Sequence, residues 1–170
     1  MKIFLFVFCL MNICICKSQS RLNLSIHQDL RLLLVGDERG NEIFTPDILV
    51  KLEVEAFKIK NSSIYLYFGL EYAALNSSSL SRFSLGFGYV TSFSFLQKLH
   101  FGIFVGHGLI LRSGGSFMGL GADLETSYPI SKKIRLSLLY QIIDRNDLTT
   151  LFHTNRNIKG SIFIGLKMPL

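Results

Sequence analysis

The fold is decided by the stretch Lys98–Tyr128, which reads KLHFGIFVGHGLILRSGGSFMGLGADLETSY. It contains two runs in which large apolar residues alternate with small or polar ones, joined by Arg112–Ser116 (RSGGS). A period of two is the signature of a β-strand, because successive side chains point to opposite faces. Glycine and serine in the link are typical of a turn. The stretch predicts a β-hairpin with one apolar face and one face of glycine, histidine and carboxylates.

The rest of the chain repeats this alternation, so we expect eight antiparallel strands in total. Two of them lie in the hairpin, and the other six are expected at residues 22–34, 48–59, 64–75, 82–93, 133–143 and 158–168. The links at 60–63, 94–97 and 129–132 are short, whereas those at 36–47 and 144–157 are long and polar. Short turns at one end and longer loops at the other are typical of up-and-down barrels in outer membranes.

The N-terminus has the pattern of a secretory signal peptide over residues 1–20. Lys2 is followed by an apolar run from residue 3 to 16, and Ser18-Gln19-Ser20 offers small residues for cleavage. A retained membrane anchor is a less favoured alternative because the apolar run is short. A lipoprotein signal is less favoured because isoleucines precede Cys14 and Cys16. All three cysteines lie in this segment, so the mature domain, residues 21–170, has no thiol.

Composition limits the classes of protein that the mature domain can be. Charged residues make up 18% of the 170-residue chain and hydrophobic ones 49%, against roughly 25% charged in ordinary soluble domains. Loss of Lys2 and Lys17 with the signal peptide lowers the formal net charge from +6 to +4. This dispersed surplus gives no reason to expect a nucleic-acid partner.

The non-apolar face of the strands indicates which side is inside. A water-facing surface should be rich in charged residues, whereas this face carries nine glycines together with serine and tyrosine: Gly69, Gly86, Gly88, Gly102, Gly106, Gly108, Gly119, Gly121 and Gly165. Small residues suit the crowded interior of an eight-stranded barrel. We therefore predict an all-β, eight-stranded antiparallel up-and-down transmembrane β-barrel. A secreted soluble lipocalin-like barrel and a β-sandwich remain alternatives with the faces reversed.

The charges on the same face have both signs. Unpaired buried charge is costly, so inside a narrow lumen we expect these residues to pair. The candidate lumen charge network comprises Asp29, Arg31, Lys51, Glu53, Glu55, Glu71, Asp123, Glu125, Arg135 and Lys167.

With its signal peptide and eight alternating strands, the chain resembles small outer-membrane β-barrel proteins of the OmpA/OmpX type. The resemblance covers the whole chain but is one of pattern. It implies a location in the outer membrane of a Gram-negative bacterium, surrounded by lipid, after insertion by the barrel-assembly machinery. Members often end in an aromatic residue that this machinery reads, and here the chain departs from them, ending Met168-Pro169-Leu170.

Some barrels of this size modify lipid A or phospholipids. A deacylase of that kind needs His and Ser two apart on one strand face, and no H-x-S occurs here. A second type needs His, Asp and Ser on loops; Asp144, Asp147 and His153 share a loop, where Thr149, Thr150 or Thr154 would have to replace serine. A lipid A or phospholipid-modifying enzyme therefore remains an alternative function.

No spacing of His, Asp and Glu is specific enough to predict a metal, and no motif indicates a cofactor. We expect a non-enzymatic barrel with negligible conductance that acts through its surface loops. Residues 36–47 and 144–157 are the expected points of contact with an extracellular partner.

Overall fold

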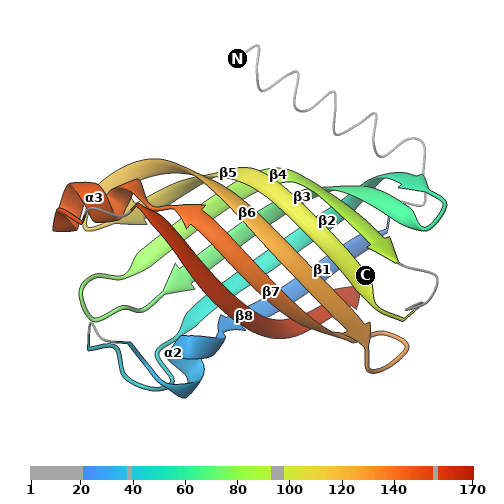
Figure 1. Cartoon of the computed structure of the whole chain (residues 1–170), viewed down its shortest axis with the longest axis horizontal. Coiled ribbons are helices and arrows are strands. Elements are labelled where there is room, and N and C mark those ends of the chain that lie inside the picture. Colours follow the sequence, from blue (N-terminus) through green and yellow to red (C-terminus); the bar gives the residue numbers. More distant parts are fainter. Residues whose placement is uncertain (1–20, 38–39, 93–97, 155–156) are drawn as a thin grey trace, which may run out of the picture.

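The computed structural model describes residues 21–37, 40–92, 98–154 and 157–170. In this part of the chain eight strands form one closed antiparallel barrel in chain order, with β1 pairing both β2 and β8 (Figure 1). The strands are β1 (Leu22–Asp29), β2 (Asp47–Ile59), β3 (Ser62–Ala73), β4 (Leu80–Ser92), β5 (His100–Arg112), β6 (Gly115–Pro129), β7 (Arg135–Asp144) and β8 (Ile158–Pro169). The predicted fold class is confirmed. The predicted signal peptide and the link at 94–97 lie outside the described residues.

The two faces of the wall have the predicted orientation. On β5, Ile103 and Val105 are each 55% exposed, while Phe104 between them is fully buried in the lumen. Apolar side chains are exposed around the wall in the same way on the other strands. Soluble monomers rarely expose contiguous apolar surface beyond roughly a few hundred Å². The wall therefore faces lipid, and closure gives the backbone hydrogen bonds that a bilayer demands.

Glycines on the inward face make room for two aromatic rings. The rings of Phe104 and Tyr67 meet edge to face, with centroids 5.6 Å apart. A Cβ placed on Gly102 would lie 2.7 Å from Cε2 of Phe104, and one on Gly88 would overlap the same ring. The glycines on the inward face therefore leave space that these aromatic side chains fill.

The first strand is shorter than the predicted 22–34. It ends at Asp29, and a one-turn helix, α2 (Leu30–Leu34), follows. The Asp29 carboxylate accepts a hydrogen bond from the backbone N–H of Leu32 at 2.9 Å, which caps the helix. The prediction of strand for residues 30–34 was wrong because alternating leucines fit one helical turn as well as a strand.

The connections at one end of the barrel are longer than those at the other, mainly because of two long connections. Residues 30–46 and 145–157 form the long connections, and the second of them contains the helix α3 (Asn146–Phe152). Between β5 and β6 the turn consists of Ser113 and Gly114, with φ of 49° and 75°. Two positive φ values define a type I′ hairpin turn, which is tighter than the five-residue link expected. We refer to the end with α2 and α3 as the loop end.

Within the described residues no helix has the length and apolar character needed to cross a membrane.

Candidate functional site

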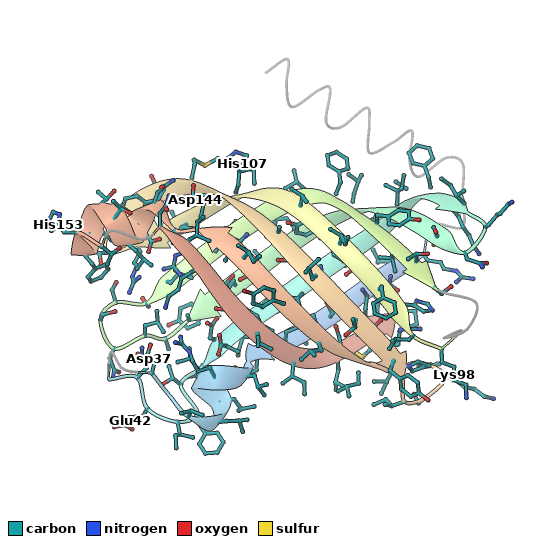
Figure 2. All side chains as sticks on the ribbon, in the orientation of Figure 1. Asp37, Glu42, Lys98, His107, Asp144 and His153 are labelled. Carbon is teal, nitrogen blue, oxygen red and sulfur yellow. The ribbon has the colours of Figure 1, made fainter. Side chains whose placement is uncertain are left out.

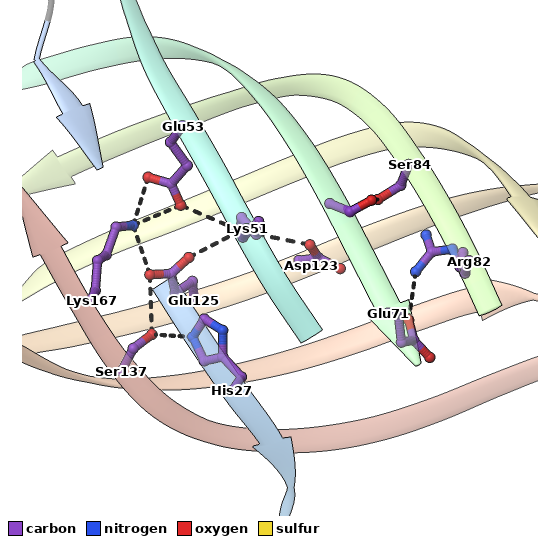
Figure 3. Close-up of polar contacts among 11 residues, drawn as sticks. His27, Lys51, Glu53, Glu71, Arg82, Ser84, Asp123, Glu125, Ser137 and Lys167 are labelled. Carbon is purple, nitrogen blue, oxygen red and sulfur yellow. Dashed lines mark hydrogen bonds and ion pairs between the residues drawn. The ribbon is translucent and has the colours of Figure 1, made fainter. Parts of the chain in front are cut away.

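A cluster of five charged side chains fills the middle of the lumen. Lys51 Nζ on β2 lies 3.0 Å from Glu125 Oε2 and 3.6 Å from Glu53 Oε1. It also lies 3.7 Å from the carboxylate of Asp123. Lys167 on β8 bridges Glu53 at 2.7 Å and Glu125 at 2.8 Å (Figure 3). Two ammonium groups thus hold three carboxylates from opposite sides of the barrel, and all five side chains are buried.

An aromatic ring completes this cluster. Lys51 Nζ lies 3.4 Å from the ring centroid of Phe104 and 5.4 Å from that of Tyr67. An ammonium group over an aromatic face is attracted by the ring quadrupole, most strongly where water is excluded. The five charged residues with Phe104 and Tyr67 form what we call the lumen plug.

A histidine and a serine extend the plug to β1 and β7. His27 Nε2 lies 3.0 Å from Ser137 Oγ, and Ser137 donates a hydrogen bond to Glu125 Oε1 at 3.1 Å. The three residues are buried, and the serine proton is directed to the carboxylate rather than to the imidazole. A nucleophilic serine needs the reverse arrangement, with the base accepting its proton. This contact therefore positions groups in the plug.

A second ion pair lies nearer the loop end. Arg82 Nη1 donates to Glu71 Oε2 at 3.2 Å, both residues being buried. Sequence reasoning did not single out Arg82, although it shares strand parity with Ser84 and Gly86 on the inward face. Alternation alone could have placed it inside.

A third group ties α3 to the barrel. Asp147, at the start of α3, accepts hydrogen bonds from Arg145 Nε at 2.7 Å and from Arg112 Nη1 at 3.2 Å. Burial alone would raise the pKa of Asp147, but the hydrogen bonds and charges of the two arginines outweigh it and hold that pKa below its usual value. Arg112 also stacks on Phe152, 4.7 Å from the ring centroid. We call Arg112, Arg145 and Asp147 the α3 clasp.

A recess that is partly open to solvent lies at the loop end, bordered by Glu71 on the barrel wall and by Leu32 of α2 and Leu148 of α3. It is lined by side chains of both signs, among them Asp47, Glu71, Arg112, Arg145 and Lys159. The plug thus fills the middle of the lumen, and this recess lies toward the loops.

The predicted charge network is distributed over several places. Five of its ten members meet in the plug, and Glu71 pairs with Arg82. Asp29 caps α2, Glu55 is buried on β2, and Arg135 at the opposite end donates to Ser127. Arg31 lies on α2 beyond the end of β1, at the edge of the recess, with its side chain half exposed and 3.9 Å from Asp37.

The side chains considered for lipid chemistry have structural roles. Asp147 is enclosed in the clasp, and His153 forms the left-handed C-cap of α3. Thr150 donates to the backbone carbonyl of Asn146, and Asp144 accepts from Asn157. In the described part of the chain no three His, Cys, Asp or Glu residues are grouped as metal ligands would be.

The barrel is similar to solved outer-membrane proteins. The outer membrane protein Ail of Yersinia pestis, in a phospholipid bilayer nanodisc, matches with a TM-score of 0.58 and 12% identity over 89% of this chain and 100% of that one. A crystal structure of Ail, the attachment invasion locus protein, matches with a TM-score of 0.51 and 12% identity over 89% and 97% of the two chains. No protein-family model and no curated protein sequence matches the chain. The chain therefore has the fold of a small outer-membrane β-barrel, with its apolar wall toward lipid.

Proposed function

We propose that the chain is an integral, non-enzymatic outer-membrane protein of a Gram-negative bacterium that acts at the cell surface through its loops. Residues 1–20 would be removed as a signal peptide, and residues 21–170 would be inserted by the barrel-assembly machinery. Loops 36–47 and 144–157 would meet an extracellular partner. The observation that carries this proposal is the lumen plug.

The plug argues against both transport and chemistry in the lumen. Its two ammonium groups and three carboxylates pair with one another at 2.7 to 3.7 Å, and Phe104 covers Lys51. A catalytic acid or base must reach a substrate with its proton, and these groups are already bound to one another. What is left to interact with other molecules is the loop end and the outer wall.

Two further observations support a role at the cell surface. The clasp fixes α3 to the barrel by buried ion pairs, so this loop presents a defined shape. The similar structures are of a protein named for attachment and invasion, and one of them is of that protein in a phospholipid bilayer nanodisc. Rigid scaffolds with elaborated loops are a common basis for recognition.

Surface display can be tested by cysteine labelling, because residues 21–170 contain no cysteine. Thr149→Cys places a thiol on the exposed side of α3, and Lys132→Cys places one in the exposed link at the opposite end. A membrane-impermeant maleimide should label Thr149→Cys on intact cells and label Lys132→Cys only after lysis. The reverse result, or equal labelling of both, would contradict the proposal.

The absence of enzymatic activity is tested separately. We expect cells that express the protein to have the same lipid A and phospholipid mass spectrum as cells that express Asp147→Ala or His153→Ala. A lipid species that depends on either residue would show that the chain is a lipid-modifying enzyme.

A further inference from the structure

The segment that follows β1 exposes an unusual apolar surface. It consists of the described residues 30–37 and 40–44, that is α2 and the residues after it, and we call it the α2 segment. Leu34 is 59% exposed, Val35 74%, Ile43 52% and Phe44 74%. Surface loops are ordinarily polar, so four large apolar side chains in one such segment call for an explanation.

Hydrogen bonds hold these side chains in an outward position. The backbone N–H groups of Val35 and Gly36 donate to the carbonyl of Arg31 at 2.8 and 3.0 Å. Asp37 N donates to Asn41 O at 3.0 Å, and the Asn41 amide returns a bond to the Asp37 carboxylate at 2.8 Å. The exposed leucine and valine are therefore followed by backbone that hydrogen bonds hold in place.

Ile43 and Phe44 occupy the tip of a turn. Thr45 closes it, with its backbone N–H 3.2 Å and its Oγ1 2.7 Å from the carbonyl of Glu42. Phe44 has a φ of 66°, a left-handed conformation that glycine and asparagine adopt far more easily. A bulky residue in this conformation, with its ring exposed, points to a function for the ring.

The α2 segment projects sideways from the barrel. Figure 1 shows α2 beside the wall, short of the far end reached by α3. In Figure 2, Glu42 lies outside the outline of the wall, whereas Asp37 lies closer to the barrel. The neighbouring lipid-facing residues Ile26 and Ile48, at the adjacent ends of β1 and β2, are also exposed. The apolar surface of the segment thus continues the lipid-facing wall.

We propose that the α2 segment lies in the lipid interface of the outer leaflet, with Leu34, Val35, Ile43 and Phe44 inserted among the lipids beside β1 and β2. An apolar surface that extends laterally from a membrane barrel at its loop end meets lipid before it meets anything else. Aromatic and aliphatic side chains that insert in this way are typical of interfacial segments. The inference goes beyond the proposed surface role, because it assigns Ile43 and Phe44 of the first loop to lipid, so that a partner would meet the remaining residues of loop 36–47 together with loop 144–157.

The absence of tryptophan from the chain allows a direct test. Phe44→Trp, in vesicles that contain phospholipids brominated near the headgroup, provides a single fluorescent reporter at the turn. Leu124→Trp on the exposed face of β6 is the control in lipid, and Thr149→Trp on α3 is the control in water. We expect the emission of Phe44→Trp to fall as far as that of Leu124→Trp, and that of Thr149→Trp to stay unchanged.

Quenching of Phe44→Trp no greater than that of Thr149→Trp would overturn the proposal. So would emission from Phe44→Trp that is protected only at high protein-to-lipid ratio, since that would mean a second copy covers the segment. Ile43→Trp provides the same readout if Phe44→Trp does not fold. The cysteine-labelling test of surface display uses different residues, so the two proposals can fail independently.

Discussion

At the scale of the residue, Lys51 is the centre of the lumen plug. It pairs with three carboxylates and covers the Phe104 ring, so its removal leaves Lys167 as the one ammonium group of the plug against three buried carboxylates. Loss of one member of a buried ion pair costs about 3–5 kcal/mol. We expect Lys51→Met, which keeps the side-chain volume, to lower the free energy of unfolding by about this amount. Urea unfolding in lipid vesicles would measure it.

The matched control is Lys58→Met on the same strand, where the lysine is exposed. An exposed charge contributes little, so this variant should unfold at nearly the same urea concentration as the wild type. Equal midpoints for Lys51→Met and Lys58→Met would mean that the plug does not stabilise the barrel.

The α3 clasp makes stability depend on pH through Asp147. Its lowered pKa means that its ionised form stabilises the folded protein above the unfolded pKa of about 4. This contribution is lost as the pH falls through the lower pKa of the folded state. The difference in unfolding free energy between wild type and Asp147→Asn should therefore be constant above about pH 5 and shrink at lower pH. If the difference does not change with pH, the stability of the clasp does not depend on the ionised form of Asp147.

Alternation in the sequence could place individual residues inside or outside but could not pair them. Lys51 and Glu53 are visible as inward charges from β2 alone, whereas their contacts to Glu125 and Lys167 depend on closure of the barrel across 74 and 114 residues. The contact of His27 with Ser137 could not be predicted for the same reason, because it also joins strands that are far apart in the sequence. Arg112 was missed for another reason, because it was assigned to a turn that in fact begins after it.

At the scale of the element, the glycines of β4 and β5 act together with the Phe104 ring. A side chain on Gly88 or Gly102 would occupy the space of the ring. We expect Gly88→Val to destabilise the barrel by about 1–3 kcal/mol through overpacking. Phe104→Ala should be destabilising alone but should relieve Gly88→Val in the double variant. A double-mutant cycle should give a coupling of about 0.5–3 kcal/mol, and additive effects would refute direct packing.

The strands were predictable as elements because each presents an apolar row to lipid and a small or charged row to the lumen. The residues at which the strands begin and end were less predictable. The turn at Ser113 and Gly114 was recognisable from its residues, but its type follows from the twist of the strands that it joins. Residues 30–34 show the limit most clearly, since a five-residue helix is too short for its period to differ from alternation.

At the scale of the whole molecule, the composition of the two faces carried the prediction of a membrane barrel. Glycine and paired charge can fill a narrow interior but make a poor water-facing surface, so the inward face was identifiable without coordinates. The helices α2 and α3 at the loop end could not be predicted from the sequence. Their stability depends on contacts with distant strands, such as that of Asp147 with Arg112.

Closure itself depends on the seam between the first and last strands. There β8 pairs with β1 from Phe163 to Pro169, with Leu166 opposite Ile26, and with β7 on its other side. Proline cannot donate to a ladder and is tolerated at the start of a strand but not within it. We therefore expect Leu166→Pro to open the seam, and Ile158→Pro, at the first residue of β8, to leave the barrel closed.

Electrophoretic mobility before and after heating distinguishes these states, because a closed barrel keeps its ladder of hydrogen bonds in SDS until it is boiled. The wild type and Ile158→Pro should change position on heating, whereas Leu166→Pro should run at the heated position throughout. The two variants differ in their position within β8, because both lose one backbone donor and an exposed apolar side chain, but only Leu166 also lies opposite a residue of β1. A heat-dependent shift in Leu166→Pro would show that the barrel withstands a break in this ladder. A wild type that does not shift and remains in the aqueous fraction would show that the apolar wall is not a lipid-facing surface.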